Sequence, residues 1–356
     1  MKTLLLNSLA LALIATSPAS AQIAQPAAPA EAPAPFSATE AAAVVEKLAV
    51  ALDENFVFPE VGKECAAALR AKLKAGGYSN FADAKAFATA VTADLQAIHP
   101  DGHLRLQAPG PAASGERRMR RGPGTENTIE KAGWLAEGVA YISFTSFPGN
   151  EATLARLGEF LRVHSSAKTL IIDARRHGGG GLAEMDIIFP QLFDKAQLLV
   201  NMDTRLAVEQ RRGSFVEEGV TLKRADGPSG VVRRSHWAVP TPEASGLRKS
   251  RVFLLTSKRT ASAAEHLALS LKRTGRATLI GETTRGAGHY GNIEDLGSGY
   301  SAFIPFGRTF DPETGQGWEG KGVAPDVEVP AEQALDEALR RAGVAPDAAK
   351  SLASLS

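Results

Sequence analysis

The chain has a single cysteine, Cys65, among its 356 residues. It therefore cannot form a disulfide within itself, and it cannot build a cluster of thiolate metal ligands. Cys65 lies in a helical pattern, and we interpret it as a small buried apolar residue. An excess of charge is also missing, because 40 lysines and arginines stand against 39 aspartates and glutamates. A nucleic-acid-binding surface needs an excess of positive charge, so we expect no nucleic-acid partner.

Long apolar runs are absent apart from a short one near the start of the chain. Residues 4–14 are mostly apolar, Lys2 precedes them, and Ala19-Ser20-Ala21 has the small residues of a cleavage site. The run is too short to span a bilayer, so residues 1–21 are predicted to be a secretory signal peptide. We expect an exported protein, periplasmic or secreted, with no transmembrane segment. Residues 22–36, rich in Ala and Pro, are predicted to be a linker.

The next part of the chain has the pattern of a small helical unit. Apolar residues recur at helical spacing and predict three helices, one after the capping box that begins at Ser37, one over residues 61–75 and one over residues 81–98. We therefore predict an N-terminal helical unit over residues 37–106. Residues 107–133 are rich in Pro, Gly and Arg, include a basic run at 117–121, and are predicted to be a linker or loop.

From residue 134 onward, strands alternate with helices. Strands are predicted at 139–144, 169–173, 197–201, 252–256, 277–280 and 300–305, with helices at 154–164, at 182–193 and after Ser262. Several of these strands are apolar throughout, which indicates that both of their faces are buried. Residues 134–345 are therefore predicted to form an α/β layered domain.

One turn in this domain holds a candidate nucleophile. Ser262 lies between the strand at 252–256 and the start of a helix. Backbone amides at a helix N-terminus point toward developing negative charge, so a serine at this place can act as a nucleophile. The alternative is that Ser262 only caps the helix, which is a common role for serine.

Two further side chains could complete a relay with this serine. His103 follows a glycine turn in Asp101-Gly102-His103, and an imidazole that titrates near neutral pH suits the activation of a hydroxyl. Glu319 lies between an aromatic residue and a glycine, and it could orient a histidine as the third member of such a relay. Taken singly, a histidine is more often an ordinary surface or core residue than a base, and Glu319 is typical of a surface turn.

Four consecutive glycines, 178–181, follow the apolar strand at 169–173. Glycines allow backbone amides to turn toward a ligand. The amide of Gly179 or Gly180 could form a two-donor oxyanion hole with that of Ala263, although a plain flexible turn remains the alternative. No Lys-Ser/Thr pair follows the glycines, so this is no phosphate loop. We also expect no metal site, because Pro100 and Gly102 prevent His99 and His103 from forming a helical ligand pair.

Five motifs and their order along the chain resemble those of the S41 peptidases, the tail-specific or C-terminal processing protease family. They are Asp-Gly-His-Leu from Asp101, Asp-x-Arg-x-x-Gly-Gly-Gly from Asp173, Thr-Ala-Ser-Ala-Ala-Glu from Thr260, Gly-Glu-Thr-Thr-x-Gly from Gly281, and Glu-Gly-x-Gly-Val-x-Pro-Asp from Glu319. The resemblance covers nearly all of the chain after the predicted linker at 22–36. It implies an α/β layered core of the ClpP/crotonase type behind a small N-terminal helical unit.

The resemblance also indicates a branch of the family. The C-terminal processing branch has a catalytic lysine downstream of its serine, but Ala287 stands at that position here. Residues 107–133 leave no room for the PDZ domain of that branch. The chain instead resembles the branch that includes the tricorn protease core and the interphotoreceptor retinoid-binding protein. The tricorn pattern implies Ser262 as nucleophile, His103 as base and Glu319 as their partner.

Two other functions remain open at this point. Retinoid-binding relatives use the same scaffold to carry apolar ligands, so the fold does not guarantee turnover. Acyl-thioester chemistry on a crotonase-like core would not need the serine. The presence of Ser262, His103 and Glu319 together favours an exported serine peptidase that works through an acyl-enzyme. Its expected partner is a peptide or protein substrate, and it needs no cofactor.

Overall fold

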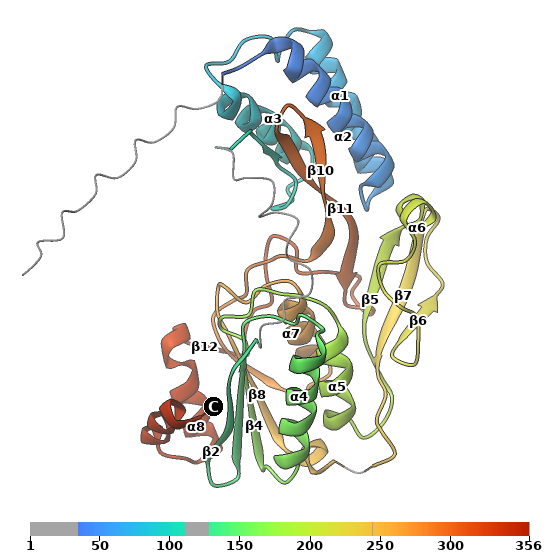
Figure 1. The fold of residues 1–356 in the computed structure, drawn as a ribbon. Coiled ribbons are helices and arrows are strands. Elements are labelled where there is room, and N and C mark those ends of the chain that lie inside the picture. Colours follow the sequence, from blue (N-terminus) through green and yellow to red (C-terminus); the bar gives the residue numbers. More distant parts are fainter. Residues whose placement is uncertain (1–34, 111–127, 244, 356) are drawn as a thin grey trace, which may run out of the picture. The chain divides into compact units, whose positions relative to one another are not determined.

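The computed structural model describes residues 35–110, 128–243 and 245–355 (Figure 1). The predicted signal peptide, nearly all of the predicted linker at 22–36 and the basic run at 117–121 lie outside these described residues. Every described residue belongs to one compact unit, Pro33–Ser356. Within the described part, none of the helices combines the length and the apolar character that crossing a membrane requires.

The first three elements are helices, as predicted: α1 (Ala38–Asn55), α2 (Pro59–Lys74) and α3 (Ala84–Ile98). The side chain of Ser37 caps α1 by accepting the N–H of Glu40, which is one of the two contacts of the predicted capping box. Asp83 caps α3 through the N–H of Ala86 at 2.7 Å. Cys65 is free and buried on α2, and burial raises the pKa of its thiol to about 11, as fits a packing residue.

The apolar faces of these helices share a core with a strand from the far end of the chain. Leu48 of α1 and Phe87 of α3 belong to the same buried cluster as Tyr300 and Ile304 of β11 (Tyr300–Phe310). The short strand β1 (Leu106–Gln107) pairs antiparallel with β11. The segment between α3 and β1, which carries His103, is therefore held at both of its ends (Figure 1).

One of two six-stranded sheets is mostly parallel, in the order β12-β9-β8-β4-β3-β2, and only its β2–β3 pair is antiparallel. Its strands are β2 (Ile129–Ala136), β3 (Val139–Phe144), β4 (Thr169–Asp173), β8 (Arg251–Thr256), β9 (Thr278–Gly281) and β12 (Val327–Glu328). Ile129 pairs with Phe144, so β2 begins inside the segment predicted to be a linker.

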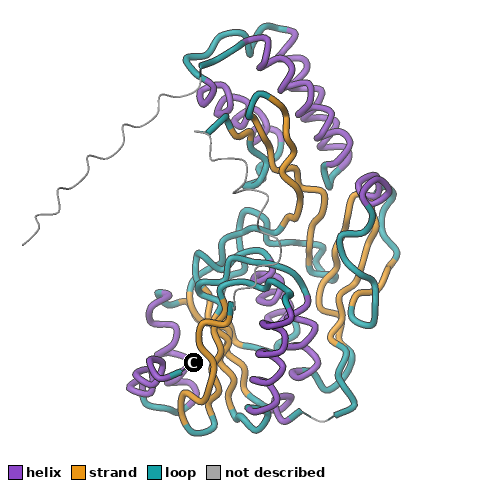
Figure 2. Tube along the Cα trace, in the orientation of Figure 1, coloured by secondary structure: helices purple, strands orange, loops and turns teal. Residues whose placement is uncertain are grey.

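Helices cover this sheet on both faces (Figure 2). Leu170 and Ile172 of β4 belong to the same buried cluster as residues of α4 (Glu151–Val163), α5 (Ala183–Leu192) and α7 (Ala263–Arg273). Ile171, between them, belongs to the cluster that includes α8 (Ala334–Ala342). Successive side chains of a strand point to opposite faces, which explains why β4 is apolar throughout. The predicted α/β class with an N-terminal helical unit is confirmed.

The other sheet is antiparallel, in the order β1-β11-β5-β7-β6, with β10 paired to β11. Its further strands are β5 (Gln197–Arg205), β6 (Leu222–Ala225), β7 (Val231–Ala238) and β10 (His289–Gly297). The remaining elements are α6 (Leu206–Arg212) and the short 3-10 helices Gly246–Lys249, Ala331–Gln333 and Pro346–Ser354. Of the longer strands in this sheet, only β5 and the first half of β11 were predicted.

Three loops that leave the carboxyl ends of parallel strands contact one another. The hydroxyl of Thr260, after β8, donates to the carbonyl of Ala174, after β4, at 2.8 Å. The N–H of Arg285, after β9, donates to the carbonyl of Thr260 at 2.9 Å. The carboxyl end of a parallel sheet is where α/β proteins place their sites. The glycine run and Ser262 both lie in these loops.

Candidate active site

Ser262 occupies a strained turn between β8 and α7. Its φ of 56° and ψ of −118° are rare for a residue with a Cβ, and Ser298 is the one other non-glycine with positive φ among the described residues. An ordinary N-cap residue has extended backbone angles with negative φ. Ser262 is half-buried and lines a cavity of about 470 Å³. This backbone geometry goes beyond what a capping role requires.

Glu265 holds this turn from inside the protein. Its fully buried carboxylate accepts the N–H of Ser262 at 2.8 Å and the N–H groups of Gly286 at 2.6 Å and Ala287 at 2.8 Å. Burial raises the pKa of Glu265, while hydrogen bonds from Thr284 and from these amides act against that rise. The sequence signal for this residue is its place three positions after Ser262, as in a capping box. Its hydrogen bonds to the backbone of residues 286–287 could not be predicted from the sequence.

The glycine run needs its glycines. Gly179 and Gly180 have φ values of 118° and 140°. A Cβ on Gly179 would lie 2.8 Å from the Cβ of Ser262, and one on Gly180 would overlap the carbonyl of Phe147. Close packing against the serine turn, rather than flexibility alone, therefore requires glycine here.

Two amides near Ser262 are free to bind an oxyanion. The N–H of Gly179 already donates to Nδ1 of His177 at 3.0 Å. Within the described residues, the N–H groups of Gly180 and Ala263 have no such acceptor. Both residues line the cavity together with Ser262. Of the predicted donors, Gly180 and Ala263 fit the role, whereas the amide of Gly179 is engaged.

His177 connects the glycine run to the serine turn. Its carbonyl accepts the N–H of Ala261 at 3.0 Å, while its ring accepts the N–H of Gly179. The side chain is fully buried, and burial lowers its pKa to about 3, so the ring is neutral at physiological pH. Because Nδ1 accepts, the proton sits on Nε2, which has no partner in the described structure. Nothing in its motif distinguished this histidine as a functional residue before the structure was known.

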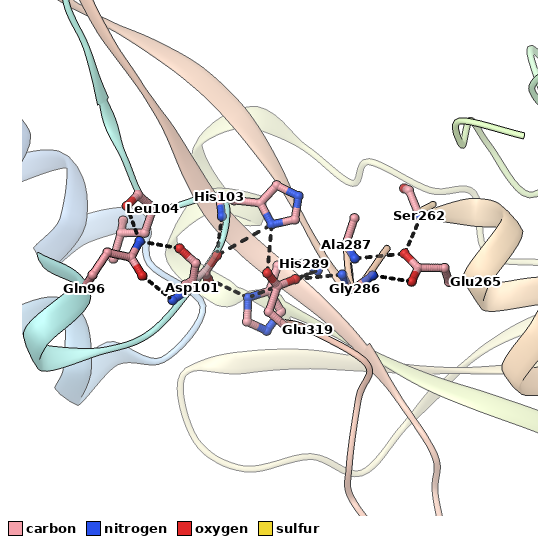
Figure 3. A network of polar contacts seen from close by, with 11 residues as sticks. Gln96, Asp101, His103, Leu104, Ser262, Glu265, Gly286, Ala287, His289 and Glu319 are labelled. Atoms are coloured by element: carbon pink, nitrogen blue, oxygen red, sulfur yellow. Dashed lines mark hydrogen bonds and ion pairs between the residues drawn. The ribbon is translucent and has the colours of Figure 1, made fainter. Parts of the chain in front are cut away.

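The predicted partners His103 and Glu319 are in contact (Figure 3). Nδ1 of His103 lies 3.1 Å from Oε1 of Glu319 and 3.5 Å from Oδ1 of Asp101. The other oxygen of Glu319 accepts the N–H groups of Gly288 at 2.7 Å and His289 at 2.9 Å. Glu319 is therefore a fixed member of the site and does not lie on a surface turn.

Asp101 and His289 support this pair, and neither was assigned a role from the sequence. Asp101 is fully buried, accepts the N–H of His103 at 2.8 Å and lies 2.7 Å from Nδ1 of His289. Gln96 on α3 holds the same turn, because its side chain accepts the N–H of Asp101 at 3.1 Å and donates to the carbonyl of Leu104 at 2.7 Å. These contacts fix the direction of the His103 ring (Figure 3).

The two carboxylates change the titration of His103. Burial disfavours its cation, but hydrogen bonds and charge from Asp101 and Glu319 outweigh burial and raise its pKa to about 9. Burial likewise opposes the charge on Asp101, yet its bonds to His103 and His289 hold its pKa below the usual range. The expectation that His103 titrates near neutral pH is therefore wrong, because its carboxylate neighbours stabilise the imidazolium.

Ser262 and His103 belong to two clusters joined by one short segment. The 286–287 backbone is bound to Glu265 beside Ser262, and the 288–289 backbone is bound to Glu319 beside His103. Figure 3 shows Ala287 between the serine cluster and the histidine cluster. No hydrogen bond joins Ser262 to His103 in the described structure. The structure thus brings His103 and Glu319 together, and it brings Ser262 together with the glycine run.

A metal ion could be held by part of the same cluster. Asp101, His289 and Glu319 each offer one ligand atom, and these atoms lie within 4.8 Å of one another. Each of the three side chains already makes a hydrogen bond within the protein: Asp101 with the N–H of His103 and with His289, and Glu319 with the N–H of His289. A metal would have to displace the proton that His289 shares with Asp101.

The sequence profile of peptidase family S41 matches residues 138–329, which is more than half of the chain. The chain belongs to peptidase family S41. A second profile, the N-terminal domain of this family in eukaryotic IRBP, matches residues 38–133. These two matches cover the helical unit and the sheets that surround the candidate site. The protein is therefore a serine-type peptidase, and its substrates are peptides or proteins.

Solved structures with the same fold include peptidases of this family. A putative peptidase from Parabacteroides merdae has a TM-score of 0.55 and 17% identity, over 83% of this chain and 90% of that one. The photosystem II D1 C-terminal processing protease has a TM-score of 0.52 and 16% identity, over 83% and 94%. A lipoprotein from Streptococcus agalactiae has a TM-score of 0.50 and 15% identity, over 86% and 96%. At these identities the likeness concerns the fold of this S41 peptidase.

Proposed function

We propose that this S41 peptidase cleaves peptide bonds through an acyl-enzyme on Ser262, with His103 as the base. The contact of 3.1 Å between His103 Nδ1 and Glu319 Oε1 carries the assignment of the base. A carboxylate only accepts hydrogen bonds, so Nδ1 donates to Glu319 and Nε2 is left to exchange a proton with the reacting groups. Glu319 orients the ring and stabilises its cation.

The reaction follows from this arrangement. Oγ of Ser262 forms a bond to the carbonyl carbon of the peptide, and its proton passes to Nε2 of His103. The carbonyl oxygen takes the negative charge, and the amides of Gly180 and Ala263 donate to it. The C–N bond then breaks as His103 returns the proton to the leaving amine. Water attacks the resulting ester with the same base, which releases the acid and restores Ser262.

The proton transfer requires Nε2 of His103 to approach Oγ of Ser262 when substrate binds. Catalytic hydrogen bonds often tighten only in the complex with substrate. Ala287 supports this route, because its small side chain stands where the C-terminal processing branch has a catalytic lysine. No ammonium group is therefore supplied at that position to act as the base.

Hydrolysis of a fluorogenic peptide by His103→Ala tests the proposal. We expect kcat to fall by about 10³- to 10⁶-fold, as on loss of a triad base. His164→Ala is the matched control, since the side chain of His164 is buried and bonds to the carbonyl of Phe160, with no contact to Glu319 or Asp101. Unchanged turnover by His103→Ala would remove it from the mechanism. A non-catalytic carrier of apolar ligands would show no turnover even in the unaltered protein.

We also propose that the protein is exported, on the basis of the predicted signal peptide at residues 1–21. Cleavage after Ala21 would leave Gln22 as the first residue. The mass of the protein recovered from the periplasm or the medium tests this directly. An intact mass that includes residues 1–21 in every fraction would contradict export by cleavage at this site.

A further inference from the structure

The cavity beside Ser262 has the form of a pocket for a substrate side chain. It measures about 470 Å³, and its lining includes Ser262 and both residues with a free amide, Gly180 and Ala263. Most of its other walls are apolar, and they include Leu182, Met202, Phe215 and Trp318. A side chain that enters it would have a long apolar surface to pack against.

The charges that line this cavity are of one sign. Asp186 of α5 and Glu217 are among its lining residues, and no lysine or arginine is among them. The side chain of Asp186 is 37% exposed, and its Oδ1 lies 3.0 Å from Nε2 of His236. Its second oxygen has no protein partner in the described structure. One carboxylate oxygen is therefore available to a ligand.

Two buried histidines form a hydrogen-bonded chain that ends on Asp186. Because a carboxylate only accepts, His236 donates to Asp186 from Nε2. Nδ1 of His236 in turn lies 2.9 Å from Nε2 of His266. Burial, helped by the proximity of His236, lowers the pKa of His266 well below its usual value. The ring of His266 is therefore neutral, and its Nδ1 has no hydrogen-bond partner among the described residues.

His266 also fixes the depth of the pocket relative to the nucleophile. It follows Ser262 by four residues on α7, which is about 6 Å along a helix axis. His266 and Asp186 both line the cavity, so a ligand there meets the free carboxylate oxygen of Asp186 and the unpartnered ring nitrogen of His266. Such a pocket suits a side chain with a long apolar stem and hydrogen-bond donors at its tip.

We propose that this cavity selects lysine or arginine as the substrate residue whose carbonyl is attacked by Ser262. This proposal rests on the proposed function of Ser262 as nucleophile. The methylene stem packs between the apolar walls, and the cationic tip binds the free oxygen of Asp186. A carboxylate in a pocket beside the nucleophile gives the same kind of selectivity in trypsin. Acidic substrate residues are rejected, since two carboxylates and no lysine or arginine would face them.

Fluorogenic peptides that differ only at this residue test the proposal. Arginine, neutral citrulline of nearly the same shape, and glutamate are compared by kcat/KM. We expect arginine to exceed citrulline by at least about tenfold, as a close charge pair provides, and glutamate to be the poorest. Asp186→Asn keeps an oxygen that can accept from His236 but removes the charge. We expect this variant to reduce the arginine-to-citrulline ratio to about one.

Asp194→Asn is the matched control, because Asp194 is exposed just after α5 and outside the cavity. It should leave the arginine-to-citrulline ratio unchanged. Citrulline cleaved as well as arginine, or a ratio that survives Asp186→Asn, would overturn the selectivity while leaving Ser262 as nucleophile. If no peptide is cleaved and Ser262 does not react with a fluorophosphonate probe, the proposed function fails and the selectivity fails with it.

Discussion

The pH dependence of hydrolysis should be set by the two carboxylates around His103. Their hydrogen bonds and charge raise its pKa to about 9 against the effect of burial. The base must be neutral to accept a proton, and only about 1% of it is neutral at pH 7 if its pKa is about 9. We therefore expect kcat/KM to rise about tenfold per pH unit below this value and to level off above it.

Glu319→Gln should move this profile in a characteristic way. The substitution removes an anionic oxygen 3.1 Å from Nδ1 of His103. An opposite charge at such a distance shifts a pKa by about 1–3 units, so the inflection should move to lower pH by that amount. At high pH the variant should be slower by about 10²- to 10⁴-fold, because an amide also permits the wrong tautomer.

These two effects oppose each other near neutral pH. The lower pKa increases the neutral fraction of His103 at pH 7 by about 10- to 100-fold, which partly offsets the loss of orientation. The deficit of Glu319→Gln should therefore be smaller at pH 7 than at pH 10. Initial rates on one fluorogenic peptide from pH 6 to pH 10.5 measure both quantities. Glu313→Gln is the control, as Glu313 is exposed and pairs with Arg273. An inflection that stays in place, or a deficit independent of pH, would refute the reasoning.

Three further predictions follow from the same contacts. Ser262→Ala should abolish hydrolysis at a stability cost of about 1 kcal/mol or less, measured by denaturant unfolding, whereas Ser298→Ala, which also changes a serine with positive φ, should remain active. His177→Ala should lower kcat by about 10-fold or more with little change in KM, because the N–H of Gly179 loses its acceptor. In His177→Asn the side-chain oxygen can replace Nδ1 as that acceptor, so most of the rate should be restored. Equal losses in both variants would contradict this positioning role. The raised pKa of His103 stabilises the folded protein fully below about pH 6.5, and this stabilisation is lost as the pH rises through about 9. The free energy of unfolding should therefore fall by about 1–3 kcal/mol across that interval. A free energy of unfolding that does not change with pH would argue against the shift.

The local elements were predictable where the pattern of apolar residues is regular. The three N-terminal helices, β3, β4 and β8 follow from helical spacing or from fully apolar runs. Most strands of the antiparallel sheet were not predicted, because they contain charged residues. The ion-pair partners of these residues become apparent only in the folded structure. On β7, for example, the fully buried Arg234 is bonded to Glu209 and Glu218. A buried arginine reads as a surface residue until its partners are known.

The reacting groups of the site could be predicted from the sequence, but the residues that position them could not. Ser262, His103 and Glu319 could be chosen from motifs and their order, and the structure places His103 against Glu319. His289 could not be chosen, because it reaches Asp101 from 188 residues away through the β10–β11 hairpin. Asp186 and His266 likewise meet through His236, over separations of 50 and 30 residues. Such contacts depend on the register in which strands pair. In strands that carry polar residues on both faces, the sequence specifies this register only weakly.

The nucleophile is the central claim, and covalent labelling tests it most directly. A fluorophosphonate probe reacts only with a serine that is activated by a base and an oxyanion hole. After incubation with the probe, mass spectrometry of the digested protein should find one adduct, on Ser262, formed in step with the loss of hydrolysis. An adduct on another serine, or complete inactivation without any adduct on Ser262, would contradict the account.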